Sequence, residues 1–184
     1  MSAGPGHGTG RALLITGAVG VGKTTTADAV GDELEERGIP GAVLDVDTLR
    51  RAWPAPPGDR FHAALTLRAL TALSAIHREA GARVLVAAEV IEERSARDAY
   101  EQAMGLPLTV VRIRTPRELV RERLRERHAR DPEGLAWHRD RFDELTAILD
   151  AAAVEDVSVG QVGSPRETAR ALLAAVGLGD RAAR

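Results

Sequence analysis

Apolar and polar positions follow two alternating patterns along the chain. Short apolar runs predict buried strands, and they cover residues 12–16, 41–47, 83–90, 108–114 and, more weakly, 155–160. Longer segments with helical spacing predict helices, over residues 24–38, 60–81, 95–105, 115–129, 134–152 and 164–177. Because strands and helices alternate, we expect a parallel sheet with helices on both of its faces.

Two of the predicted helices begin with recognisable signals. Thr115 followed by Pro116 predicts an N-cap with proline in the first turn, and Ser164 with Glu167 has the spacing of a capping box. No internal repeat or long linker separates the elements. We therefore expect one domain over residues 11–178, between a flexible tail at 1–10 and a short tail at 179–184.

The composition narrows the class of protein. The chain has 184 residues, of which 44% are hydrophobic, which suffices for one domain with a full core. Its net charge of −2 gives no general attraction to nucleic acid or to a membrane surface. It has no apolar run of about 18 residues that would span a bilayer. With no cysteine and no signal-peptide pattern in residues 1–10, we expect a cytoplasmic protein; its oligomeric state is not predicted.

The clearest chemical motif lies between the first predicted strand and the first predicted helix. Gly17, Gly22, Lys23 and Thr24 match the pattern G-x-x-x-x-G-K-[ST]. In such a loop, backbone N–H groups surround phosphate oxygens, and the start of the helix adds its positive end. We expect the whole segment to bind the nucleotide, through Gly17, Gly20, Val21, Gly22, Lys23, Thr24 and Thr25.

Lys23 stands out because it is the only lysine among 25 basic side chains; the other 24 are arginines. An ammonium group on a flexible stem can reach the β- and γ-phosphates through a narrow loop, whereas a planar guanidinium does not fit the same space. Thr24 can place its hydroxyl on Mg²⁺. The motif therefore predicts ATP and Mg²⁺ as ligands, with Lys23 as a catalytic residue.

Several classes of nucleotide-binding protein do not fit the chain. A guanine-specific GTPase would need Asn-Lys-x-Asp, but the chain has no asparagine and no second lysine. An AAA-type ATPase would end the third strand in Asp-Glu, whereas this strand offers only Glu89. What remains is the group of compact kinases that phosphorylate nucleotides or small molecules.

Asp45 and Asp47 are candidates for the phosphate acceptor's side of the site. Two positions apart on a strand, they would point to one face, at the end of the sheet where ligands bind. A kinase acting on a hydroxyl group needs a carboxylate there to accept the proton, and we assign that role to Asp47. Alternatively, Asp47 only caps the next helix and Asp45 is solvated.

Arginines in the segment 115–130 are candidates for a lid over the phosphates. Arg123, Arg127 and Arg130 follow the spacing i, i+4, i+7, which places them on one helical face. Arg127 and Arg130 would neutralise charge during transfer, and Arg123 would stack on adenine. In a chain so rich in arginine, a plain salt-bridged surface remains the alternative.

The remaining candidates are less specific. Glu89 would hold Mg²⁺ or contact the acceptor. Trp53 and Phe61 flank a proline-rich segment and would wall an acceptor pocket, or else belong to the core. The five histidines show no spacing typical of metal ligands.

Taken together, these motifs resemble the small P-loop kinases typified by adenylylsulfate, shikimate and gluconate kinases and, most closely in pattern, chloramphenicol phosphotransferase. The matching blocks are the P-loop, "DVDTL", "GARVLVAAEV" and "RERLRERHARD". The resemblance implies a P-loop NTPase three-layer α/β sandwich, with a five-stranded parallel sheet of order 2-3-1-4-5 and an arginine-bearing lid. It also implies that Gly163 and Ser164, in the segment 160–165, lie against adenine. The third strand departs from the antibiotic kinase, which has paired aspartates where this chain has Ala88 and Glu89.

The sequence thus predicts an ATP-dependent kinase that phosphorylates a hydroxyl group of a small metabolite or antibiotic-like acceptor. Two other functions stay open: a nucleotide-binding sensor without transfer activity, and a nucleotide monophosphate kinase.

Overall fold

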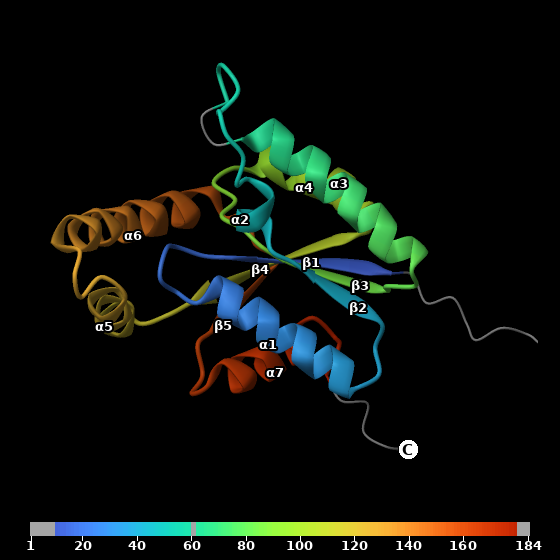
Figure 1. Ribbon diagram of the computed structural model, residues 1–184. Helices are drawn as coiled ribbons and strands as arrows, with labels where there is room; N and C mark the ends of the chain where they lie inside the picture. The colour runs from blue at the N-terminus through green and yellow to red at the C-terminus, as the bar shows by residue number, and fades with distance from the viewer. Residues whose placement is uncertain (1–9, 60–61, 180–184) are drawn as a thin grey trace, which may run out of the picture.

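The computed structural model describes residues 10–59 and 62–179 (Figure 1). Its strands are β1 (Arg11–Thr16), β2 (Gly41–Leu44), β3 (Val84–Ala88), β4 (Leu108–Arg114) and β5 (Val157–Gly160). Its helices are α1 (Lys23–Glu36), α2 (Val46–Leu49), α3 (Ala63–Glu79), α4 (Arg94–Met104), α5 (Arg117–Arg127), α6 (Pro132–Ala152) and α7 (Pro165–Ala175). Within these residues, no helix is long and apolar enough to cross a membrane.

The five strands form one parallel sheet in the order β2-β3-β1-β4-β5, as the resemblance implied. The central strand β1 pairs on both sides, so that Leu13 lies opposite Val86 of β3 and Thr109 of β4. Because β1 is central, its carboxyl end, where the P-loop begins, lies in the middle of the sheet's edge. This is the edge at which parallel α/β sheets bind ligands.

A hydrophobic core fills each face of the sheet. Side chains alternate along β1, so Leu13 and Ile15 join the core shared with α1 and α7, while Ala12 and Leu14 join the core shared with α3 and α4. Figure 1 shows these two helix pairs on opposite sides of the sheet. Each fully buried leucine or isoleucine contributes about 1.5–3 kcal/mol. The two cores hold β1, and therefore the loop that follows it, in place.

The second strand is shorter than predicted, which corrects the placement of Asp45 and Asp47. β2 ends at Leu44, and the short helix α2 begins at Val46. Asp45 caps α2: its Oδ1 accepts a hydrogen bond from the Thr48 backbone N–H at 3.2 Å and its Oδ2 one from the Thr48 hydroxyl at 2.7 Å. A carboxylate that can cap a helix competes with strand extension. The two aspartates therefore do not share a strand face, and it is Asp45 rather than Asp47 that caps the helix.

The segment around α5 also differs from its prediction. α5 begins at Arg117 after Pro116, and no side chain caps it. The Thr115 hydroxyl instead donates to the Val21 carbonyl of the P-loop, at 3.0 Å. α5 ends at Arg127, so Arg130 lies beyond the helix and does not share a helical face with Arg123. The capping box predicted at Ser164 is present, and it starts α7.

Candidate active site

The loop between β1 and α1 has the backbone that a phosphate cradle requires. Gly17 has φ +151°, and a Cβ there would lie 2.9 Å from the Ile113 carbonyl oxygen of the neighbouring strand. Gly22 has φ +96° and is the N-cap residue of α1. A side chain at either position would strain the turn. The loop therefore leaves the N–H groups at the start of α1 available to bind an anion.

Lys23 begins α1, and its ammonium group folds back over the loop. Its Nζ donates to the Ala18 carbonyl oxygen at 3.2 Å. Burial lowers the pKa of Lys23 from 10.5 to about 8; the Asp47 carboxylate opposes this change and the Arg127 guanidinium adds to it. Lys23 is thus a poorly solvated cation that lies near both predicted partners, Asp47 and Arg127.

A cavity of about 580 Å³ opens over this loop. Side chains and backbone from β1–α1, α2, α5, α6 and α7 line it. The lining includes nine residues predicted from the sequence: Gly20, Val21, Gly22, Lys23, Thr24, Thr25, Asp47, Arg123 and Arg127. Residues more than 100 positions apart in the chain therefore meet here.

The carboxylate and the guanidinium groups approach the cavity from different elements. Asp47, in the first turn of α2, is 77% exposed and lies 3.6 Å from the Arg50 Nε. Arg123 and Arg127 are one turn apart on α5, and Arg123 donates to the Val21 carbonyl at 3.4 Å. An accessible carboxylate and two cations therefore surround Lys23, whereas Arg130 is not among the lining residues.

Glu89 is placed differently from its prediction. It is buried, accepts a hydrogen bond from the Val90 backbone N–H at 2.7 Å, and forms an ion pair with Arg50. Arg50 also pairs with Asp47, so it links Glu89, which is not one of the lining residues, to a carboxylate that is. Arg50 was not predicted from the sequence, because among 24 arginines no spacing marks it.

The other predicted residues lie around or outside the cavity. Trp53 is 88% exposed and is not one of the lining residues, and Phe61 lies outside the described residues. Gly163 and Ser164 directly precede Pro165, which does line the cavity together with Gln161 and Thr168. The predicted adenine segment thus lies next to the cavity, although Gly163 and Ser164 themselves are not among its lining residues.

The lining residues that were not predicted include Trp137 and His138 of α6. Their helix was predicted, but nothing in its periodicity tells which of its faces meets the P-loop.

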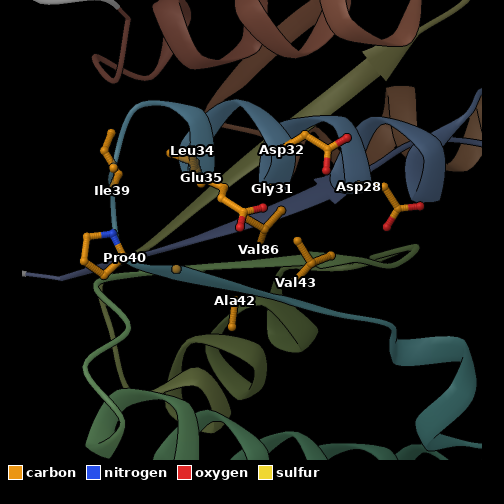
Figure 2. Close-up of a pocket in the computed structure, with 12 residues that line it drawn as sticks. Asp28, Gly31, Asp32, Leu34, Glu35, Ile39, Pro40, Ala42, Val43 and Val86 are labelled. Carbon is orange, nitrogen blue, oxygen red and sulfur yellow. The ribbon is translucent and has the colours of Figure 1, made fainter.

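A second, larger cavity of about 750 Å³ lies between α1 and β2, away from the P-loop (Figure 2). Asp28, Asp32 and Glu35 of α1 stand along it, above the apolar side chains Val43 and Val86. Three carboxylates repel phosphate groups. The 580 Å³ cavity, with its cations and free N–H groups, is therefore a better candidate for a nucleotide site than this one.

The residues at this site also fit Mg²⁺. In the described part of the chain, no three His, Asp or Glu side chains gather to hold a metal ion by themselves. Mg²⁺ in kinases binds through one or two protein oxygens, phosphates and water. Thr24, exposed at the start of α1 inside the cavity, offers such an oxygen.

Comparison with known proteins agrees with this geometry. The profile of the AAA domain family matches residues 13–152. The chain is 32% identical over 148 residues to adenylyl-sulfate kinase of Paraburkholderia xenovorans (strain LB400), covering 77% of this chain and 76% of that protein.

Solved structures share the fold along most of their length. The tunicamycin resistance protein of Deinococcus radiodurans is 24% identical, with a TM-score of 0.64 over 92% of this chain and 96% of that one. Shikimate kinase from Acinetobacter baumannii is 18% identical, with a TM-score of 0.61 over 91% and 93%. These findings confirm the resemblance to adenylylsulfate and shikimate kinases.

The family description corrects one exclusion. The lack of an Asp-Glu pair at the end of β3 argued against an AAA-type protein, yet the matched family carries that name. The pair is therefore not required for membership of this family.

Proposed function

Since this chain belongs to the AAA domain family and is a P-loop kinase of the small-molecule group, we propose that it transfers the γ-phosphate of ATP to a hydroxyl group of a small acceptor. The observation that carries the proposal is the convergence of Lys23, Asp47 and Arg127 on one cavity. A cation for the phosphates, a carboxylate for a proton and a second cation on a separate helix are what phosphoryl transfer to a hydroxyl group requires.

In the proposed reaction, each side chain acts at a stated atom. The acceptor oxygen forms a bond to the γ-phosphorus, and the bond to the β–γ bridging oxygen breaks, so that ADP leaves. Asp47 takes the hydroxyl proton, and Lys23 and Arg127 neutralise charge on the transferred group. Thr24, together with phosphates and water, would hold Mg²⁺, which would supply positive charge to the phosphate oxygens.

One side of the cavity suits the nucleobase. Arg123 lies beside the loop carbonyl of Val21, and Gln161 and Pro165 lie at the carboxyl edge of β5. A guanidinium plane and a proline ring offer flat surfaces on which adenine can stack. This arrangement supports the roles proposed for Arg123 and for the segment 160–165.

The relatives suggest acceptor classes. Shikimate is bound in the Acinetobacter structure, and the Paraburkholderia relative is an adenylyl-sulfate kinase. On the acceptor side of this chain, Arg50 is engaged by both Glu89 and Asp47. Its charge is thereby offset, so we expect an acceptor that does not depend on an anionic group for its binding.

The test replaces Asp47 with asparagine, which keeps the size of the side chain and removes its ability to take a proton. If Asp47 is the base, transfer in a panel of hydroxyl compounds should fall by about 10²- to 10⁴-fold. The affinity for Mg–AMPPNP and the melting temperature should stay close to those of the wild type. The matched control is Asp32→Asn, because Asp32 is an exposed carboxylate on a different helix, α1.

Two results would contradict the proposal. Full transfer by Asp47→Asn would remove Asp47 from the reaction. A wild-type protein that binds Mg–ATP but phosphorylates no compound of the panel would favour a nucleotide sensor instead.

A further inference from the structure

The cavity has one wall that the proposed transfer does not use, formed by Trp137 and His138 of α6. Trp137 is 60% exposed, although both residues line the same cavity as Lys23 and Asp47. An indole ring carries a large apolar surface, and leaving it in water inside a binding cavity gains nothing for the fold. The position of this ring therefore points to a ligand that covers it.

Both rings are held in place before any ligand binds. The His138 ring meets the Trp137 ring edge-on, with centroids 4.7 Å apart, and packs against His128 with centroids 4.3 Å apart. The His138 Nδ1 lies 2.7 Å from the Gly134 carbonyl oxygen. Because a carbonyl only accepts hydrogen bonds, Nδ1 donates to it, and in the tautomer with its proton on Nδ1 the ring offers Nε2 as an acceptor.

The parts of the nucleotide have other partners. The loop and Lys23 face the phosphates, and the nucleobase end is formed by Arg123 and by Gln161 and Pro165, which flank the start of α7. In Figure 1, α6 and α7 lie on opposite sides of the loop that joins β1 to α1. A ligand that covers the α6 wall is therefore the acceptor rather than the nucleobase.

Building on the proposed function, we propose that Trp137 and His138 bind the acceptor, and that this acceptor is a ring that carries at least two hydroxyl groups. The flat face of the indole stacks on the ring. One hydroxyl lies at Asp47 for phosphorylation, while a second donates to Nε2 of His138. An open-chain alcohol offers the hydroxyls but no face to stack on.

The first experiment measures binding of the acceptor under conditions in which no phosphate is transferred. The chain has two tryptophans, so Trp53→Phe leaves Trp137 as its only indole fluorophore. At saturating Mg–AMPPNP, this variant is titrated with a panel of cyclic polyols, sugars and phenols, with myo-inositol and sorbitol as a matched ring and open-chain pair. We expect ring compounds of the panel to change the Trp137 fluorescence, and open-chain alcohols and the nucleotide alone to leave it unchanged.

The second experiment separates acceptor from nucleotide. Trp137→Ala removes the stacking face, and His138→Phe keeps the ring packing but removes the Nε2 acceptor. Each should raise the KM for the acceptor by about tenfold, with kcat and the Kd for Mg–AMPPNP unchanged. Ile76→Ala, an equally exposed apolar side chain on α3, is the control for surface truncation and should change neither.

The outcomes distinguish this inference from the proposed function. Ring compounds that change the fluorescence but are never phosphorylated would overturn the kinase activity and leave the ring site standing. If no ring compound changes the fluorescence, or if only open-chain alcohols are phosphorylated, the inference is wrong. A loss of nucleotide affinity in Trp137→Ala that equals the loss for the acceptor would assign the indole to the nucleobase.

Discussion

At the scale of single residues, the ammonium group of Lys23 responds to opposing influences. Burial lowers its pKa to about 8, against the attraction of Asp47. Below pH 8, the folded protein carries the cost of a poorly solvated charge, and this cost is relieved as the pH rises from 8 toward 10.5. Phosphate groups need the charged form. Nucleotide binding should therefore take up a proton once the pH exceeds 8.

We expect the Kd for Mg–AMPPNP to rise by up to about tenfold per pH unit above pH 8, as measured by calorimetry in buffers of different ionisation enthalpy. Lys23→Met should bind Mg–AMPPNP more weakly, with a Kd that does not change with pH in this range.

Lys23→Arg should lose transfer by about 10³-fold or more, because the guanidinium does not fit the loop. An arginine variant with near-normal transfer would show that only the charge matters at this position.

At the scale of elements, local signals predicted what local interactions determine. The P-loop and the capping box at Ser164 need only neighbours in the chain, and both are present. The end of β2 was predicted too late, because the helix cap formed by Asp45 outweighed the alternating apolar pattern. The start of α5 was predicted too early, because the Thr115 hydroxyl does not cap the helix but donates to the carbonyl of Val21, 94 positions away. Contacts between residues so far apart in the chain produce no periodic pattern in the sequence.

The pairing of α1 with α7 gives a prediction at this scale. Burial alone would raise the pKa of Glu33, but hydrogen bonds from Arg37, Arg166 and Arg170 lower it overall. Its contribution to stability is therefore present at neutral pH and is lost as the pH falls through the lowered pKa. Glu33→Gln should reduce the free energy of unfolding by about 2 kcal/mol in urea at pH 7, and by less at pH 3. Glu36→Gln, which removes a half-exposed partner of Arg166, should cost much less. Equal losses would mean that the burial of Glu33 is unimportant.

At the scale of the whole molecule, the site is a product of the complete fold. The lining residues that the sequence predicted belong to the P-loop, to "DVDTL" and to the arginine segment, each of which carries a chemical pattern. Trp137 and His138 carry none, and they line the cavity because α6 packs where it does. Arg50 carries none either, and it meets Asp47 from the end of α2. The motif residues that line the cavity were thus predictable from the sequence, while the wall formed by α6 depends on packing between distant segments.

Because the cavity joins β1–α1 to α5, α6 and α7, a bound nucleotide should stabilise the molecule as one unit. At Mg–AMPPNP equal to 100 times its Kd, the free energy of unfolding should rise by about 2.7 kcal/mol. We expect circular dichroism and Trp137 fluorescence, measured in Trp53→Phe, to report the same single transition with and without the nucleotide. Glu33→Gln should gain the same increment, since Glu33 is not one of the lining residues of the cavity. Two transitions, with only one shifted by the nucleotide, would show that α5 and α6 unfold independently of the sheet.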